Sequence, residues 1–450
     1  MTRRYEVVVI GSGTAASTVA SRCRAAGWTI AVVDSRPFGG TCSLRGCDPK
    51  KILVGAAEAV EWVRRLSGKG VESANTRIDW SRLVEFKRSL IADVPRSREA
   101  GFLKRGIDAF HGRATFSGPT TVVVGDDVLE GRYVVVAAGA RPATVRIPGA
   151  EHLVTSEQFL ELDRLPSRIL FVGGGYISFE FAHIAARAGA TVSIVHRSER
   201  ALALFDPDLV EILVARTRAL GIDIHVRTEV TRIDRRGESF HVEAVGDGQT
   251  RAFTVDMVVH GAGRVPEIDD LGLDAAGVEW DIHGVRVNEY LQSVSNGSVY
   301  AAGDAAANGG PKLTPVAGYD GRIVAANLLK RNHAIHDYNV VPSVVFTIPP
   351  LSSVGLHERT ARERGLHFTT HHEQTTSWYS SRRIGESASG FKVLVEEESG
   401  RVLGAHLLGP DADEAINLFA MAMRSGMPAR TIKEMVFSYP TVASDILYMV

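Results

Sequence analysis

Two copies of one pattern constrain the fold of this chain more than any other feature. The first copy has an apolar run at 5–10, the turn G-S-G-T-A-A at 11–16, a helical run to about residue 27, and an apolar run at 29–33 that leads into an acid. Strands that are apolar throughout are typical of a parallel sheet covered on both faces. Glycines in such a turn let the backbone approach a pyrophosphate, and an acid after the second strand accepts hydrogen bonds from a ribose. The pattern predicts a dinucleotide site that contains Gly11, Gly13, Thr14, Ala16 and Asp34.

The second copy predicts a second dinucleotide site of different specificity. It has an apolar run at 168–172, three glycines at 173–175, a helical run to about residue 189 and an apolar run at 191–195. No acid stands at the end of this last strand, where an NAD site carries its ribose carboxylate, so Arg197 and Arg200 are available to hold a 2′-phosphate, which favours NADPH over NADH. The alternative is that these two arginines are merely solvated. The predicted contacts of this site are Gly173, Gly175, Tyr176, Ile177, Arg197 and Arg200.

Two of the three cysteines lie just after the first dinucleotide unit, at Cys42 and Cys47. Five residues of α-helix rise roughly 7.5 Å, whereas a disulfide needs Cα atoms about 4.4–6.8 Å apart. A bond between these cysteines therefore requires a distorted backbone, and Gly46 is where the chain can bend. We expect Asp48 to cap the next helix with Pro49 in its first turn, which places the sulfurs where a thiolate is stabilised. Two unrelated buried thiols are the alternative, since two cysteines alone make a poor zinc site.

Composition limits the class of protein. A length of 450 residues predicts two or three domains, and a net charge of -1 gives no signal for binding to nucleic acid or to an acidic membrane. The longest apolar runs are strand-sized, and strand-like residues begin at Tyr5, so neither a transmembrane helix nor a signal peptide is expected. Three cysteines argue against a secreted disulfide scaffold. We therefore expect a cytoplasmic protein in which Cys23 is an ordinary core residue.

The segment 39–51, G-G-T-C-S-L-R-G-C-D-P-K-K, resembles the redox-active disulfide motif of the flavoprotein disulfide reductases, such as glutathione reductase, lipoamide dehydrogenase and mercuric reductase. Further segments that match this family in order are 133–142, 261–266, 298–304 and 312–317. The resemblance covers essentially the whole chain. It implies an α/β fold with two Rossmann-like dinucleotide-binding domains and a C-terminal α+β dimerisation domain. The implied boundaries are 1–145 with 265–330 for FAD, 146–264 for NAD(P)H, and 331–450 for dimerisation.

The resemblance also implies an electron path. NADPH passes a hydride to FAD, and the reduced flavin opens a Cys42–Cys47 disulfide. Cys47 would be the thiolate near the flavin, and Cys42 the one that meets the substrate. Lys50 and Glu180 match the pair beside the reactive flavin nitrogen, and Tyr176 matches the tyrosine that shields the flavin, with ordinary packing as its alternative role. The remaining FAD contacts that the resemblance implies are Gly40, Thr41, Lys50, Ala114, Gly139, Gly263, Gly303, Asp304 and Thr314.

The C-terminal stretch departs from the family where relatives carry their acid–base pair. Glutathione reductases and lipoamide dehydrogenases have His-Pro-Thr and a following glutamate, which the partner subunit supplies. Here Tyr439 replaces the histidine and Ser444 the glutamate, with Asp445 adjacent. Tyrosine, with a pKa near 10, is a poor base at neutral pH. Ser21 also falls where glutathione reductases carry an arginine that binds the peptide. Mercuric reductases have tyrosine at the first position, but they end in a vicinal cysteine pair that this sequence lacks.

Three functions therefore stay open. The first is an NADPH-dependent flavin enzyme with an unusual acceptor, namely a metal ion, a quinone-like electrophile or an atypical disulfide. The second is a conventional reductase of glutathione or another small disulfide that uses another acid, with His371 and His372 as remote candidates. The third is a redox-sensing flavoprotein that acts through a partner. We expect a homodimer in which Tyr439 faces Cys42 of the partner subunit, and no nucleic-acid or membrane partner.

Overall fold

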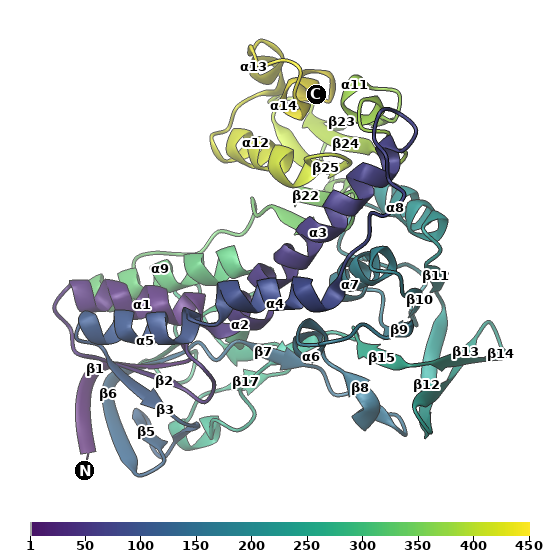
Figure 1. Cartoon of the computed structure of the whole chain (residues 1–450). Coiled ribbons are helices and arrows are strands. Elements are labelled where there is room, and N and C mark those ends of the chain that lie inside the picture. The colour runs from purple at the N-terminus through teal and green to yellow at the C-terminus, as the bar shows by residue number, and fades with distance from the viewer. Residues whose placement is uncertain (1) are drawn as a thin grey trace. The chain divides into compact units, whose positions relative to one another are not determined.

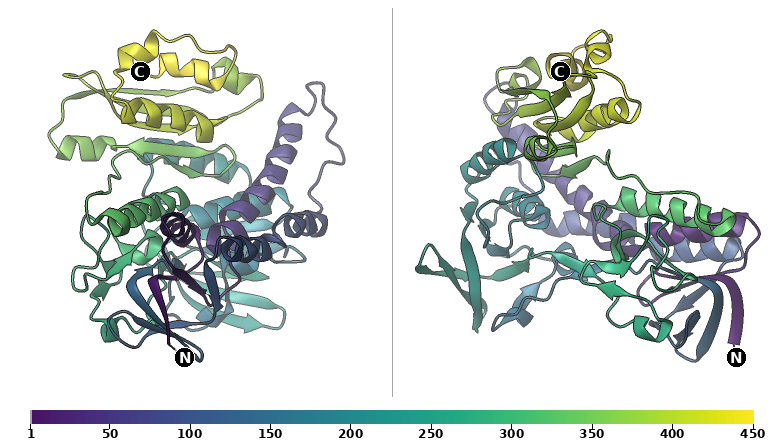
Figure 2. Two further views of the ribbon diagram at one scale, coloured as in Figure 1. Left: turned by 90° about the vertical axis from the view of Figure 1, so that its left-hand side faces the viewer. Right: turned by 180° about the vertical axis from the view of Figure 1, so that it is seen from behind.

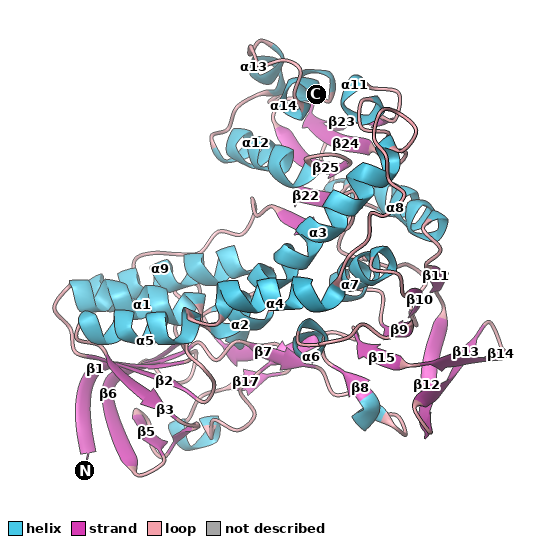
Figure 3. Cartoon of the chain, in the orientation of Figure 1, coloured by secondary structure: helices cyan, strands magenta, loops and turns pink. Residues whose placement is uncertain are grey.

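The computed structural model describes residues 2–450 (Figure 1). Two compact units share the chain, and each is assembled from three segments. The first unit comprises Met1–Lys50, Phe86–Ala143 and Arg264–Tyr338. The second unit comprises Lys51–Glu85, Thr144–Gly263 and Asn339–Val450. Helices α3 (Cys47–Leu66) and α4 (Trp80–Ile91) run from one unit into the other, and Figure 3 distinguishes all helices from strands by colour.

The first unit is built on a seven-stranded sheet of order β3-β2-β1-β6-β5-β4, in which β19 also pairs with β6. Strands β1, β2, β3, β6 and β19 pair in parallel, while β4, β5 and β6 are antiparallel neighbours. The apolar runs of β1, β2 and β6 are buried on both faces, as the sequence predicts. The strands are β1 (Thr2–Ile10), β2 (Ile30–Asp34), β3 (Asp108–His111), β4 (Ala114–Phe116), β5 (Thr121–Val124), β6 (Asp127–Val136) and β19 (Val299–Ala301).

Helices α1 (Thr14–Ala25) and α9 (Thr314–Lys330) lie side by side in the first unit (Figures 1 and 2). Their close approach depends on Gly321, because a Cβ there would lie 2.7 Å from the carbonyl oxygen of Ala15. Both helices contribute to one apolar core with the sheet. The smaller elements of this unit are α2 (Gly40–Arg45), α5 (Val94–Lys104), β7 (Ala140–Pro142), β16 (Arg264–Pro266), η2 (Leu273–Ala276), β17 (Trp280–Asp281), β18 (Gly284–Arg286), η3 (Gly303–Ala305) and β20 (Ala306–Ala307).

The second unit contains a five-stranded parallel sheet of order β11-β10-β9-β15-β8, which holds the second copy of the glycine-turn pattern. A separate antiparallel sheet, β12-β13-β14, is formed by the segment of chain between β11 and β15. The elements are η1 (Ala150–His152), β8 (Leu153–Val154), α6 (Ser156–Leu160), β9 (Arg168–Val172), α7 (Tyr176–Arg187), β10 (Thr191–Val195), α8 (Pro207–Ala219), β11 (Asp223–His225), β12 (Thr228–Arg236), β13 (Ser239–Gly246), β14 (Gln249–Val255) and β15 (Met257–His260).

The C-terminal part of the second unit is an antiparallel sheet of order β21-β22-β25-β24-β23 with short helices. Helix α12 packs its apolar face, including Ile416 and Phe419, on this sheet. The elements are β21 (Ser343–Val345), β22 (Leu351–Gly355), α10 (Glu358–Glu363), β23 (Phe368–Gln374), α11 (Tyr379–Arg382), β24 (Gly390–Glu396), β25 (Val402–Leu408), α12 (Ala412–Arg424), α13 (Ala429–Lys433), α14 (Val442–Asp445) and η4 (Ile446–Tyr448). Among residues 2–450, no helix is both long and apolar enough to cross a membrane.

Candidate active site

The cysteine segment bends at Gly46, as the sequence predicts. Helix α2 ends just before Gly46, whose backbone has φ -142° and ψ -112°, and α3 starts at Cys47. The amide of Lys50 donates to the Gly46 carbonyl at 3.0 Å, so the α3 hydrogen bonds begin two residues earlier than a cap at Asp48 would place them. The prediction that Asp48 caps α3 is therefore wrong, because Asp48 already lies inside the first helical turn. Its negative charge, in the first turn of α3, still interacts favourably with the positive end of the helix dipole.

The two thiols form an unequal pair. Both are free in this structure, with Cys42 partly exposed and Cys47 exposed. A hydrogen bond from Cys42 lowers the pKa of Cys47 to about 6, with help from Thr314 and from the charge of Lys50. The same hydrogen bond, together with burial, raises the pKa of Cys42. Cys42 has only one proton, so its 3.9 Å contact with an oxygen of Asp48, long even for sulfur, competes with that bond. At neutral pH the arrangement holds Cys47 as thiolate and Cys42 as thiol.

The first glycine turn leaves bare backbone where a pyrophosphate would lie. Gly11 has φ +109°, and a Cβ there would lie 2.3 Å from the carbonyl oxygen of Ala137. A Cβ on Gly40 would lie 2.5 Å from the Cα of Gly13, so the turn and the cysteine segment touch through backbone alone. Gly13 is the residue that precedes α1, whose free amides favour an anion. These residues fit the diphosphate of FAD, the cofactor that the resemblance implies.

Ser12 ties this turn together, a role that the sequence did not suggest. Its amide and its hydroxyl donate to Asp34 Oδ2 at 2.9 and 2.5 Å, and the amide of Arg36 donates to Asp34 Oδ1 at 2.9 Å. The Ser12 hydroxyl oxygen also accepts a hydrogen bond from the Gly39 amide at 3.0 Å. A carboxylate has about four lone-pair sites, so Asp34 retains capacity for a ribose hydroxyl. Because Ser12 is flanked by the pattern's glycines, only the hydrogen bonds reveal it.

Asp304 fits the expected contact with a ribityl chain. It is half-buried in η3, and desolvation raises the pKa of its carboxyl, opposed by the charges of Lys312 and Arg264. Within residues 2–450 its carboxylate makes no hydrogen bond, so it is available to hydroxyl donors. Asp320, which the sequence did not single out, accepts from the Gly303 amide at 2.9 Å and thereby fixes the turn before Asp304. The other predicted residues of the first unit are Thr14 and Ala16 in α1, Thr41 in α2, Ala114 in β4, Gly139 after β6, and Thr314 at the start of α9.

The second glycine turn also leaves no room for side chains. A Cβ on Gly173, which has φ +111°, would lie 2.2 Å from the carbonyl oxygen of Gly261. Helix α7 opens with Tyr176 and Ile177, and the Tyr176 side chain is 46% exposed. Gly263, predicted as an FAD contact, falls at the end of a segment assigned to the second unit. The turn therefore fits a second pyrophosphate at the N-terminus of α7.

His196 occupies the place after β10 where an acid would hold the ribose of NAD. Its Nδ1 accepts from the Gly174 amide at 3.0 Å, and its Nε2 donates to the carbonyl oxygen of Arg200 at 3.1 Å. Arg197 is exposed, whereas the Nε of Arg200 is buried without a hydrogen-bond partner in the described chain. A guanidinium N–H that lacks an acceptor is suited to a phosphate. The sequence predicted a role for the two arginines but not for His196, which bonds to the backbone of Arg200.

Glu180 and Lys50, predicted as a pair, belong to different units. Glu180 is buried in α7 and its Oε1 accepts from the Phe346 amide at 2.9 Å. Lys50 is buried in the first turns of α3. Their pairing beside a flavin stays a prediction.

Tyr439 is 80% exposed in the loop before α14. Thr441 and Ser444 form a capping box at the start of this helix, with the Ser444 amide bonded to Thr441 Oγ1 at 3.2 Å. Burial raises the pKa of Asp445, which also bonds to Ser380. The residue at the position of the family's glutamate is thus engaged in a helix cap, and the adjacent carboxyl group, that of Asp445, bonds to Ser380.

Two glycine-turn units, with a thiol pair packed against the first turn, define a dinucleotide-dependent dithiol oxidoreductase. Residues 5–321 match the family model described as pyridine nucleotide-disulphide oxidoreductase, and residues 341–449 match the dimerisation domain of the same family. The chain belongs to this family. The expected class, α/β fold and enzymatic nature are confirmed, and the enzymes of this family use FAD and NAD(P)H.

Individual relatives differ in what they reduce. A glutathione reductase of Burkholderia cepacia is 31% identical over 98% of both chains. A mercuric reductase of Staphylococcus aureus is 29% identical over 98% of this chain and 81% of its own. Among solved structures, a Cu(II) complex of the HOCl-induced flavoprotein disulfide reductase RclA from Escherichia coli is 27% identical, covers 99% of both chains and has a TM-score of 0.88.

Proposed function

We propose that this enzyme takes two electrons from NADPH and delivers them through Cys42 and Cys47 to a small acceptor that needs no proton from the protein. A metal ion or a quinone-like electrophile fits this description better than glutathione disulfide. The observation that carries the proposal lies at the family's acid–base position. There the chain offers an exposed phenol, Tyr439, and a serine, Ser444, that is engaged in a helix cap. A phenol with a pKa near 10 does not cycle as a base at neutral pH.

The thiols have distinct roles in this scheme. When bound, FAD supplies a two-electron relay between NADPH and the cysteine pair. NADPH and one proton convert the Cys42–Cys47 disulfide to the dithiol, one sulfur of which ionises. The pKa of about 6 keeps Cys47 as that thiolate, and Cys42 retains the proton. Cys42 is then the sulfur that meets the acceptor, and the disulfide re-forms as the acceptor gains two electrons and the one remaining thiol proton, that of Cys42, is released to solvent.

The relatives support a metal ion among the acceptors. Mercuric reductases match nearly the whole chain, and the solved structure of the flavoprotein disulfide reductase RclA is a Cu(II) complex. Soft thiolate pairs bind such ions well. A bound metal ion accepts electrons without a leaving thiolate, so no general acid is required at position 439.

Two arginines support NADPH as the electron donor. Arg197 is exposed beside the second glycine turn, and Arg200 has a buried N–H without an acceptor among the described residues. His196 fills the place of the NAD-type acid and bonds to the Gly174 amide instead of a ribose. A 2′-phosphate matches these donors in charge and hydrogen bonding.

A second copy of the chain would complete the site. The chain carries the family's dimerisation domain, and its α12 face exposes an apolar hollow lined by Leu418, Met421, Met427 and Met435. Met421 is 69% exposed, which is costly for an isolated subunit and expected of a covered interface. In this homodimer Tyr439 faces Cys42 of the partner subunit. Met421→Lys should shift the sedimentation coefficient toward the monomer, while Tyr379→Lys, at a position that is 59% exposed, should not.

A panel of acceptors tests the proposal directly. NADPH oxidation is followed with mercuric ion, cupric ion, a benzoquinone and glutathione disulfide, using the enzyme and its Cys42→Ser and Cys47→Ser variants. Metal-ion turnover should exceed glutathione disulfide turnover by at least about tenfold and should disappear in both variants. Fast glutathione disulfide turnover by the unmodified enzyme contradicts the proposal. Slow turnover with every acceptor, together with a redox-dependent change in assembly, favours the redox-sensor alternative.

A further inference from the structure

Three polar side chains lie in a row across neighbouring strands of the C-terminal sheet. Ser353 on β22 pairs with His406 on β25, and His406 pairs with Lys392 on β24. Residues directly opposite each other on adjacent strands project from the same face of a sheet. Helix α8 contacts these three strands. The row therefore lies under the helix, and all three of its side chains are buried.

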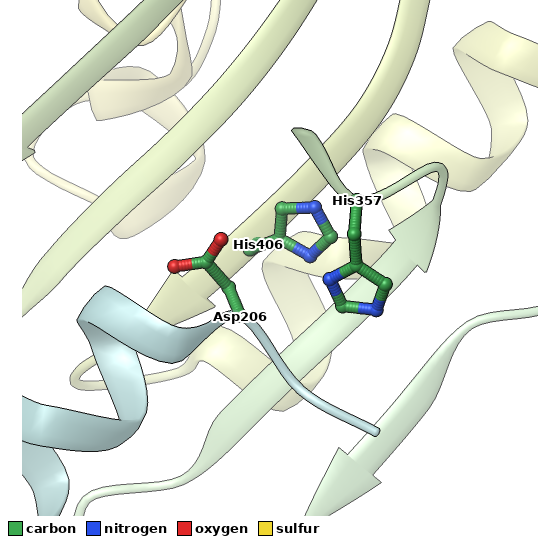
Figure 4. A group of neighbouring side chains, drawn as sticks. All are labelled: Asp206, His357 and His406. Atoms are coloured by element: carbon green, nitrogen blue, oxygen red, sulfur yellow. The ribbon is translucent and has the colours of Figure 1, made fainter. Parts of the chain in front are cut away.

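Two further side chains complete a cluster with His406 (Figure 4). Asp206 is the cap of α8, and His357 precedes α10 just after β22. One ligand atom from each of Asp206, His357 and His406 lies within 4.8 Å of the other two. Asp206 is 1% exposed and His406 0% exposed, whereas His357 is partly exposed. Three different elements thus place two imidazoles and one carboxylate together in the interior.

The hydrogen bonds of the two histidines leave the same ring nitrogen available in each. Nε2 of His357 lies 3.2 Å from the carbonyl oxygen of Leu204, and Nε2 of His406 lies 3.2 Å from that of Leu356. A carbonyl oxygen only accepts, so both Nε2 atoms carry the proton and both Nδ1 atoms carry the lone pair. An imidazole that ligates a metal ion usually donates its other N–H to such an acceptor, which fixes its orientation.

The lone pair on Nδ1 of His406 accepts a hydrogen bond that a metal ion could replace. The Ser353 hydroxyl donates to it at 2.7 Å, and a hydroxyl can rotate away. The two rings stack with centroids 4.6 Å apart and planes 12° from parallel, so their lone pairs do not yet converge. Ligands at about 2.0–2.1 Å from a tetrahedral ion lie roughly 3.3 Å apart. Binding therefore requires His357, the more exposed of the two, to turn inward by at most about 1.5 Å.

The charges around the cluster favour a cation. Lys392 Nζ lies 3.0 Å from Asp206 Oδ2, contacts Asp208 and lies 3.5 Å from Glu358. These three carboxylates are paired with two cations, because Glu358 Oε1 also accepts from Arg362 at 2.6 Å, and Arg200 acts on the group as a further cation. Three carboxylates against two directly bonded cations leave a negative balance beside the histidines. If Lys392 stays paired with Asp208 and Glu358, it can give up its contact with Asp206 Oδ2, which can then ligate a metal ion together with the histidines. Asp206 Oδ1 still caps α8 through the amides of Asp208 and Leu209 at 3.1 and 3.3 Å.

We propose that Asp206, His357 and His406 bind a divalent first-row transition-metal ion, with Zn²⁺ as the best match. Two imidazoles and one carboxylate select zinc, cobalt, nickel or copper over magnesium and calcium. Three protein ligands and one water complete a tetrahedral site. The ion joins the first turn of α8 to the C-terminal sheet, so its effect is to stabilise the second unit. No redox step at this ion is involved.

Metal binding is best measured on a parent protein that lacks the reactive thiols. The FAD-loaded Cys42→Ser/Cys47→Ser double variant removes the competing sulfur ligands. After treatment with EDTA, this parent is titrated with Co²⁺, whose visible absorption reports coordination geometry, and with Zn²⁺ by equilibrium dialysis. One ion per chain should bind. His357→Ala in this parent should weaken Zn²⁺ binding at least tenfold, and Ser353→Ala, which frees Nδ1 of His406, should leave it equal or tighter.

His371→Ala is the matched control, because His371 lies on β23 of the same sheet but outside the cluster. It should bind Zn²⁺ like the parent. Zn²⁺ should also raise the Tm of the parent and of His371→Ala, but not that of His357→Ala. Binding well below one ion per chain in the parent overturns the proposal. So does equal Zn²⁺ affinity of the His357→Ala and His371→Ala variants.

Discussion

The hydroxyl of Thr314, the first residue of α9, lies 3.5 Å from the sulfur of Cys47, although 267 positions separate the two residues. A hydroxyl can only stabilise a thiolate by donating its proton, so this contact selects the ionised form of Cys47. It is one of the causes that lower the pKa of that thiol. The contact also joins the cysteine segment to the last helix of the first unit.

Replacing this hydroxyl should raise the pKa of Cys47. A hydrogen bond to a charged group contributes roughly 1.5–3 kcal/mol at normal length, so at 3.5 Å we expect Thr314→Val to raise the pKa by about half to one unit. The rate of alkylation of Cys47 by iodoacetamide, measured against pH by mass spectrometry, reports this midpoint. Thr314→Ser keeps the donor and should titrate like the unmodified protein. Identical midpoints for Val and Ser would show that the hydroxyl has no such role.

The pH dependence of the two thiols should differ in the same experiment. The reactive thiolate of Cys47 is populated above a pKa of about 6 and is lost below it, so alkylation of the reduced protein should rise through that pH. Cys42, whose pKa is raised, should react only in much more alkaline solution. Cys42→Ala removes the main hydrogen bond to Cys47 and should shift the Cys47 midpoint upward. An unshifted midpoint in that variant would contradict the assignment of Cys42 as donor.

Cofactor preference should depend on the two arginines after β10. Each charge-assisted contact with a 2′-phosphate contributes roughly 1.5–3 kcal/mol, so Arg197→Ala and Arg200→Ala should each lower kcat/KM for NADPH about tenfold or more. NADH, which lacks the phosphate, is the internal control and should change little. Equal kcat/KM for the two nucleotides in the unmodified enzyme, unchanged in Arg197→Ala, would falsify the preference.

The local patterns of the sequence predicted more of the fold than of the site. Both glycine turns, their strands and the bend at Gly46 follow from short-range rules on backbone space, and the structure has them all. The predicted cap at Asp48 was wrong by two residues, because helix α3 begins directly after the bend at Gly46. Side-chain hydrogen bonds between residues about 20 positions apart could not be predicted from local patterns, as for Ser12 with Asp34 or Asp320 with Gly303.

The sequence also gave no sign of the cluster around His406, because that cluster depends on strand register. His406 is an ordinary residue in an apolar strand until β25 is aligned with β22 and β24. Only that alignment puts Ser353 and Lys392 on either side of it. Residue spacing in one strand predicts which face a side chain takes, but not its neighbours in other strands.

Tyr439 should matter for the choice of acceptor. Tyr439→Phe keeps the ring and removes the hydroxyl, and we expect lower residual turnover with glutathione disulfide, whose leaving thiolate takes up a proton. Turnover with mercuric ion should be unaffected. Unchanged rates with every acceptor would make Tyr439 a packing residue. Steady-state NADPH oxidation with both acceptors provides the measurement.

Restoring the family's acid–base pair should need two substitutions. Tyr439→His alone should leave glutathione disulfide turnover low, because Ser444 is neutral and cannot orient and charge-balance an imidazole as a carboxylate does. The double variant Tyr439→His/Ser444→Glu should exceed either single variant. If the single histidine variant already matches the double variant, the carboxylate is not what limits disulfide reduction here.

Because of the capping box at α14, the residue at position 444 can change its catalytic role without disturbing the local fold. The third residue of such a cap reaches back to the backbone at Thr441, and glutamate performs this task as well as or better than the serine found here. Exchange between the two residues therefore leaves the end of the chain folded while it adds or removes a catalytic charge. A descendant of a disulfide reductase can lose its acid in this way, adopt a different acceptor, and regain the acid later without passing through an unstable protein.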